Sequence, residues 1–108
     1  MKNEKIFFLN EFKKEVNEIT KWTLTLNMFV TDKANADRTV NEHKKEMGIN
    51  AYFLSNDMYA RNQQLVHMSK LCMLARILHH KFGVILADKE TWTSEVRILA
   101  FCNEYKAV

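Results

Sequence analysis

The first quarter of the chain has the hydrophobic spacing of an amphipathic α-helix. From about residue 4 to residue 30, apolar side chains recur at steps of three and four, and polar residues such as Lys13, Lys14 and Asn17 occupy the opposite side. This spacing predicts a long helix with one buried face. The apolar positions are Leu9, Phe12, Val16, Ile19, Trp22, Leu26 and Phe29.

The end of this segment also fits a β-strand. Within residues 21–30, apolar residues alternate with polar ones, among them Thr23 and Thr25, and alternation of period two is the pattern of a strand. A strand needs a partner, and the best candidate is "GVILA", residues 83–87. We favour the helix and keep a small sheet of residues 21–30 and 83–87 as the alternative.

The longest predicted helix runs from about residue 56 to Phe82. Ser55 or Asn56 can cap its N-terminus by accepting from a free backbone N–H, and Gly83 is a C-terminal stop. Given the rise per residue of an α-helix, this helix is about 40 Å long. Before it, residues 31–38 predict a polar loop, and residues 39–47 predict a short helix that Gly48 ends.

This long helix has two apolar faces on a helical wheel. Its broad face contains Leu65, Met68, Leu71, Cys72, Ala75, Leu78 and Phe82. Its narrow face contains Val66, Met73 and Ile77, and it is flanked by Lys70 on one side and by Arg76 and His80 on the other. A helix that is apolar on two sides is either central in its own fold or shared with another molecule. The narrow face is therefore the candidate binding surface.

The C-terminal quarter predicts one more helix. Residues 84–87 connect the long helix to this last one. Asp88 is a good N-cap for the last helix, and Glu90 in its first turn suits the positive end of a helix dipole. The predicted fold class is all-α: a single domain over residues 1–108, built as an antiparallel bundle of three to four helices with a long central helix. The predicted buried stripe of the last helix is Trp92, Val96, Leu99, Cys102 or Phe101, and Tyr105.

Composition agrees with an ordinary folded domain. The 108 residues are 47% hydrophobic and 27% charged, with no proline and two glycines, which favours long helices over disorder. No apolar run reaches the roughly 18 residues that a membrane span needs, so we expect a cytoplasmic protein without membrane contact. Cys72 and Cys102 both sit in apolar patterns and are expected to be reduced core thiols, with a disulfide as the less favoured alternative.

The net charge of +3 arises in the middle of the chain. Residues 47–83 carry Arg61, Lys70, Arg76 and Lys81 against one acid, Asp57, whereas the flanking segments are close to balanced. This bias permits an acidic partner without requiring a nucleic acid.

Catalytic, metal and cofactor chemistry has little support in the sequence. The histidines and cysteines of the long helix lack the i, i+3 or i+4 spacing that lets ligands converge on a metal. The three serines lie outside any Gly-x-Ser-x-Gly turn, and Gly48 and Gly83 are too far apart to build a phosphate-binding loop. We therefore expect no enzyme activity, no metal and no cofactor.

Residues 39–61 resemble a helix-turn-helix motif. Met47, Gly48, Ile49 and Leu54 match its pattern of apolar, glycine and apolar positions, whereas Lys44, His43 and Asp57 depart from it. The resemblance implies DNA binding, with Asn50, Tyr52 and Asn56 reading bases and Arg61 lying near the DNA. A nucleic-acid-binding regulator is thus the alternative function.

The preferred function is protein binding. A small domain without a catalytic constellation most often works by occupying a partner's surface, and methionine and aromatic residues are common at interfaces. We expect a regulatory or inhibitory protein that uses Val66, Met73 and Ile77 with the rim of Lys70, Arg76 and His80. The simplest partner is a second copy, giving a homodimer. The lysine- and asparagine-rich composition favours an accessory protein of a low-GC microbe or its phage.

Overall fold

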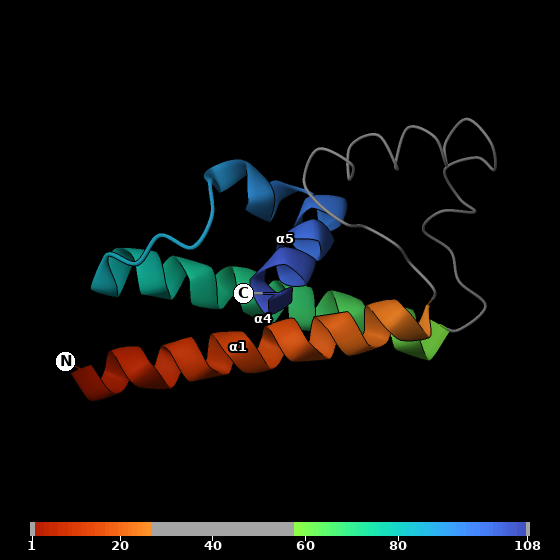
Figure 1. Ribbon diagram of the computed structural model, residues 1–108, viewed down its shortest axis with the longest axis horizontal. Helices are drawn as coiled ribbons and strands as arrows, with labels where there is room; N and C mark the ends of the chain where they lie inside the picture. Colours follow the sequence, from red (N-terminus) through yellow and green to blue (C-terminus); the bar gives the residue numbers. More distant parts are fainter. Residues whose placement is uncertain (1, 27–57, 108) are drawn as a thin grey trace.

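The protein is all-α in the residues that its computed structural model describes, 2–26 and 58–107 (Figure 1). The helices are α1 (Lys2–Thr25), α4 (Met58–Phe82) and α5 (Glu95–Ala107), with a 3₁₀-helix η1 (Lys89–Thr93) before α5. This confirms the predicted fold class, and no strand occurs within those two ranges. The predicted loop, short helix and Ser55 or Asn56 cap lie outside the described residues.

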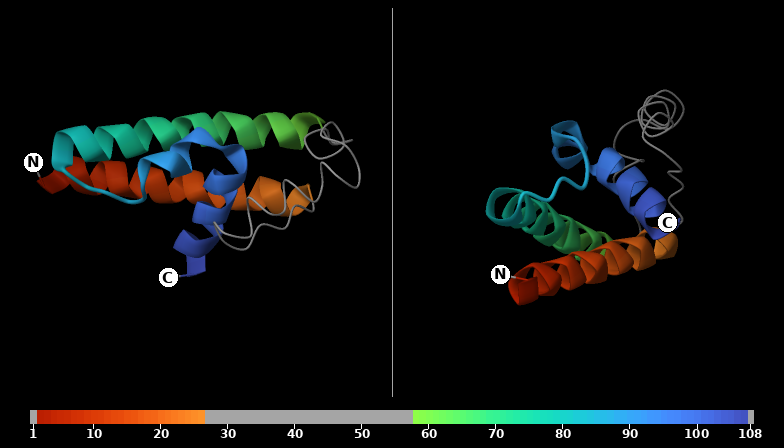
Figure 2. Two further views of the ribbon diagram at one scale, coloured as in Figure 1. Left: turned by 90° about the horizontal axis from the view of Figure 1, so that it is seen from above. Right: turned by 60° about the vertical axis from the view of Figure 1, so that its left-hand side comes forward.

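Helices α1 and α4 form an antiparallel pair that runs the length of the molecule (Figures 1 and 2). At one end, Lys81 near the end of α4 pairs with Glu4 near the start of α1. The rings of Phe8 and Phe82 lie 5.9 Å apart at the same end. At the other end, the ring of Trp22 contacts Tyr59 at the start of α4. The two longest predicted helices therefore pack on each other directly.

The strand alternative is wrong for the residues that the structure describes. Residues 21–25 form the end of α1, and residues 83–87 are irregular. The threonines that suggested a strand are accommodated in the helix because their hydroxyls donate to carbonyls one turn earlier. Thr23 Oγ1 donates to the Ile19 carbonyl at 2.6 Å, and Thr25 Oγ1 to the Lys21 carbonyl at 3.0 Å.

Gly83 ends α4 as the sequence predicts. Its φ of 69° lies in the left-handed region, which glycine adopts without steric cost. The Gly83 N–H donates to the His79 carbonyl and the Val84 N–H donates to the Leu78 carbonyl, each at 3.0 Å. Two carbonyls of the last helical turns are thereby satisfied, and the chain turns back toward η1.

Asp88 caps a helix, although a shorter one than predicted. Its carboxylate accepts from the Thr91 backbone N–H at 3.1 Å and from the Thr91 hydroxyl at 2.9 Å, and the turns that follow form η1. Ser94 is extended, with φ −138° and ψ 130°, so the predicted single helix is broken there and α5 starts at Glu95. This break lets α5 lie across the α1–α4 pair (Figure 2).

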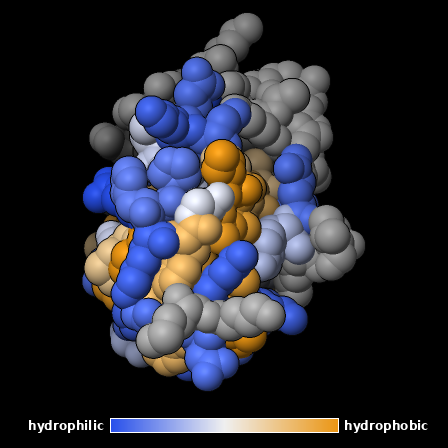
Figure 3. All heavy atoms as spheres, turned by 90° about the vertical axis from the view of Figure 1, so that its left-hand side faces the viewer, coloured by the Kyte–Doolittle hydropathy of each residue, from blue (hydrophilic) through white to orange (hydrophobic). Residues whose placement is uncertain are grey.

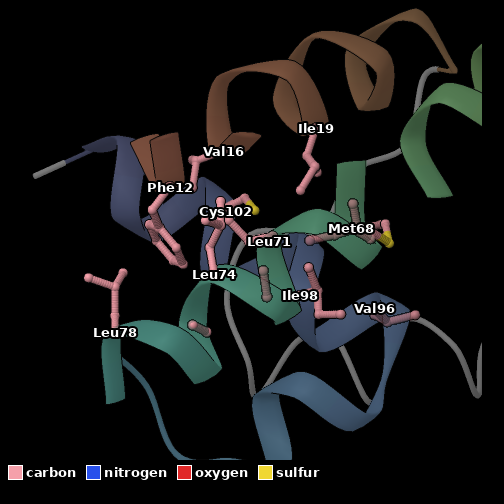
Figure 4. Packing of buried hydrophobic residues seen from close by; sticks show 13 residues of the cluster. Phe12, Val16, Ile19, Met68, Leu71, Leu74, Leu78, Val96, Ile98 and Cys102 are labelled. Carbon is pink, nitrogen blue, oxygen red and sulfur yellow. The ribbon is translucent and has the colours of Figure 1, made fainter. Parts of the chain in front are cut away.

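The core fills the space between α1, α4 and α5 (Figure 4). The predicted apolar stripes of α1 and α5 and the broad face of α4 all contribute to it. The Phe12 side chain is fully buried, and its ring contacts those of Trp92, Phe101 and Tyr105 at centroid distances of 5.5 to 6.3 Å. The buried members are Phe12, Val16, Ile19, Met68, Leu71, Leu74, Ala75, Leu78, Val96, Ile98, Leu99, Ala100 and Cys102.

Candidate protein-binding surface

The narrow face of α4 remains largely exposed in the folded chain. Val66 is 53% and Met73 52% exposed, whereas the opposite face of the same helix is buried against α1 and α5. Ile77 is half-buried at the edge of the same row. The sequence prediction that this face lies outside the broad buried face therefore agrees with the structure.

Tyr59 extends this row by two further turns. It lies seven residues before Val66, which in turn lies seven before Met73, so all three fall on nearly the same side of the helix. Tyr59 is 65% exposed and touches the Trp22 ring on α1. Sequence reasoning did not place Tyr59 in the row, although the seven-residue spacing was visible. We call Tyr59, Val66, Met73 and Ile77 the α4 stripe.

A groove borders the α4 stripe on the side of η1 and α5. It has a volume of about 440 Å³ and is lined from α4 by Cys72, Met73 and Arg76 and from the opposite side by Trp92 and Ser94. Met73 thus belongs both to the stripe and to the wall of the groove. The structure brings two predicted residues, Met73 and Arg76, together at one edge of a concave surface.

The predicted rim residues differ in their surroundings. Arg76 and His80 are exposed. Lys70, on the α1 side of the stripe, has its ammonium group 3.6 Å from a carboxylate oxygen of Glu15. Cations therefore stand on both sides of Met73.

A partly buried polar cluster lies below Lys70, between α1 and α4. Glu15 is buried, and one of its carboxylate oxygens bonds to Nδ1 of His67. Nε2 of His67 lies 3.7 Å from the Glu18 carboxylate. Sequence reasoning missed this cluster because it depends on how two helices face each other, 52 residues apart in the chain. These contacts join α1 to α4 through polar side chains.

Arg61, the fourth residue of the helix-turn-helix interpretation, is mostly buried in this structure. It is only 8% exposed, and its guanidinium donates to the Gln64 side chain and to the Glu95 carboxylate on α5. Gln64, fully buried, donates in turn to Thr23 Oγ1 at 3.0 Å. Arg61 therefore links α4 to α5 inside the molecule. The other three residues of the helix-turn-helix interpretation, Asn50, Tyr52 and Asn56, lie outside the described residues.

The two cysteines are free thiols, as expected. Burial raises the pKa of Cys72, and it raises the pKa of Cys102 to about 12. Both thiols are therefore poor nucleophiles near neutral pH. Among the residues that the structure describes, no three histidine, cysteine or carboxylate side chains gather closely enough to hold a metal ion. None of the described helices is long and apolar enough to cross a membrane.

A second area of exposed apolar surface lies at the end where α1 begins and α4 ends. Ile6, Phe7 and Ile85 are more than half exposed there. Figure 3 shows this end of the molecule, where hydrophobic and hydrophilic side chains are interspersed. The α4 stripe differs because its apolar residues are aligned along one helix and border a groove.

Comparison with known protein families, with curated proteins and with solved structures finds no match for this chain. The geometry of the α4 stripe and its groove is therefore the basis for the proposed function.

Proposed function

We propose that this protein is a small non-enzymatic regulatory or inhibitory protein that acts by binding another protein through the α4 stripe. One observation carries the proposal: Val66 and Met73 are each more than half exposed on a helix whose other face supplies the core. The central helix is thus apolar on a side that α1, η1 and α5 leave exposed.

The energetics support this use of the surface. Fully burying a valine or methionine side chain contributes roughly 1.5 to 3 kcal/mol, so burying the exposed half of Val66 and Met73 is worth about 1 kcal/mol each. Tyr59 adds an aromatic side chain of the type enriched at interfaces. The unbranched methionine side chain adapts to an irregular partner surface. Free energies of this size from a few side chains suit a regulatory contact of moderate affinity that forms and dissociates.

Site-specific photocrosslinking tests the proposal. A benzophenone amino acid would replace Met73 on α4, and in a control protein it would replace Lys13, an exposed residue of α1. We expect cross-linking in cells of the source organism to join position 73, but not position 13, to one discrete protein, which mass spectrometry would identify. A product of doubled mass containing only this chain would show that a second copy is the partner. Absence of any product at 73, or equal products at both positions, would contradict the proposal.

A further inference from the structure

We infer that the partner segment seated on the α4 stripe is an acidic amphipathic helix, whose apolar side chains contact Val66 and Met73 and whose carboxylates contact Lys70 and Arg76. This inference rests on the proposed function, since it names the chemistry of the partner at the same surface. It is carried by the charges around the stripe and by the spacing of its apolar residues.

The helix that bears the stripe has no acidic residue. Residues 58–82 contain four lysines and arginines and no aspartate or glutamate. Three of these cations lie within ion-pair distance of acids elsewhere in the fold: Arg61 pairs with Glu95, Lys81 with Glu4, and Lys70 with Glu15. Lys70, whose side chain is still 56% exposed, and Arg76 lie beside the stripe.

Lys70 and Arg76 stand symmetrically about Met73, three residues before it and three after it. The wheel positions place Lys70 toward α1 and Arg76 toward the groove, so the two cations flank opposite sides of the stripe. Among the described residues, no acidic side chain forms an ion pair with Arg76. A partner that covers Met73 therefore meets an exposed cationic side chain on each side, Arg76 toward the groove and Lys70, which it would share with Glu15, toward α1. Carboxylates at its flanking positions would be attracted to both.

The same symmetry disfavours a second copy as the occupant. If two α4 helices packed antiparallel about Met73, Lys70 would lie on the same side of the contact as Lys70 of the other copy, and Arg76 as Arg76. If they packed parallel and in register, Lys70 of one copy would lie on the same side as Arg76 of the other. Both arrangements bring like charges together at the rim of an apolar contact, which costs binding energy. An acidic partner removes this repulsion and replaces it with attraction.

The apolar spacing favours a helix over a nucleic acid. Tyr59, Val66 and Met73 are separated by seven residues each, or about 10 Å along the axis. A partner helix with apolar residues at the same repeat can meet each of them in turn. A nucleic acid would satisfy the cations but would leave these side chains against phosphates and sugars. Arg61, the cation nearest Tyr59 in sequence, is in addition held inside the molecule by Glu95.

A displayed peptide library tests this inference. The library would consist of idealised helices with leucine or isoleucine fixed at the core heptad positions and with glutamate, lysine or glutamine varied at the flanking positions. Selection against the wild-type protein should enrich glutamate over lysine at the flanking positions by about tenfold. Selection against the Arg76→Glu/His80→Glu protein should reverse that preference. Lys70 is left unchanged in this variant because its ammonium lies beside the buried Glu15.

Matched variants make each outcome decisive. Lys13→Glu changes the net charge on α1, away from the stripe, and should leave the preference for glutamate intact. The inference is overturned, while the proposed function stands, if the selected binders show no preference between glutamate and lysine. It is overturned in the same way if the Arg76→Glu/His80→Glu protein selects the same preference as the wild-type protein. Binding by each selected peptide would also be measured with Met73→Asp, whose helicity is checked by circular dichroism. If no peptide binds this variant more weakly than the wild-type protein, the inference and the proposed function both fail. If the protein binds a duplex oligonucleotide in preference to the peptides, the partner is a nucleic acid and not an acidic helix. If light scattering shows a dimer that Met73→Asp abolishes, the partner is a second copy of this chain.

Discussion

At the scale of single residues, the sequence separates core from surface well and buried polar contacts poorly. Val66 and Met73 were predicted to lie apart from the broad buried face, and both are exposed, because helical periodicity alone assigns residues to faces. The partners of His67 and Arg61 were not predicted, since the acids they meet, Glu15 and Glu95, are distant in sequence. Such contacts depend on which turns of two helices face each other, and periodicity leaves that open.

The buried pair of Glu15 and His67 gives a residue-scale prediction. Replacing His67 with alanine removes the hydrogen-bond partner of a carboxylate that is buried between two helices. Because a buried carboxylate that loses its hydrogen-bond partner is costly even with the Lys70 ammonium 3.6 Å away, we expect the free energy of unfolding to fall by about 2 kcal/mol. Urea denaturation would measure the change. His79→Ala, at an exposed position of the same helix, is the control and should cost far less. Equal costs for the two variants would show that the pair does not stabilise the fold.

The thiols give a second prediction at this scale. Since burial raises the pKa of Cys102 to about 12, its reactive thiolate is scarce at pH 8, and its side chain is also covered. Cys72, half-buried beside the groove, is more accessible. We expect an aromatic disulfide reagent to modify Cys72 first and Cys102 only after unfolding by denaturant. Peptide mapping of the modified protein distinguishes the two sites, and modification of Cys102 in the native protein at the rate of Cys72 would be inconsistent with this core.

At the scale of elements, helix ends were predicted better than helix continuity. Gly83 and Asp88 act as the expected stop and cap because each works through local backbone geometry. The break at Ser94 was not predicted: neither proline nor glycine marks it, and extended backbone there lets α5 turn across the other helices. Thr23 and Thr25 suggested a strand by alternation, but packing of the neighbouring Val16 and Ile19 into the core maintains the helix.

Gly83 provides the prediction for this scale. Nothing lies within 4 Å of a Cβ added at this position, so substitution there costs only the positive φ of 69°. We expect Gly83→Ala to lower the free energy of unfolding by about 1 kcal/mol. Gly83→Asn should cost less, because asparagine tolerates the left-handed region better than alanine does. Thermal denaturation of the three proteins would measure the order. A stability of Gly83→Ala equal to that of the native protein would contradict this role of Gly83 in ending α4.

At the scale of the whole molecule, the pattern of the sequence predicts the fold class and three of the four residues of the α4 stripe, all but Tyr59. The groove beside the stripe depends on the structure. Trp92 and Ser94 reach the groove only because η1 and α5 pack beside Met73 and Arg76. The three helices bury one face of α4 and leave the other open. We propose that the open face of α4 is where a partner binds, and every other element of the proposed function depends on this.

Quantitative capture of the cross-linked partner by variants of this protein tests that claim most directly. Met73→Asp places a charge in the middle of the α4 stripe, and we expect it to weaken capture by about thirtyfold, as for a central interface residue. Leu24→Asp places the same charge at another exposed apolar position, on α1, and should leave capture within about twofold of the native protein, since surface changes away from an interface have small effects. Equal capture by the native protein and by folded Met73→Asp would contradict the claim that the α4 stripe is the binding surface.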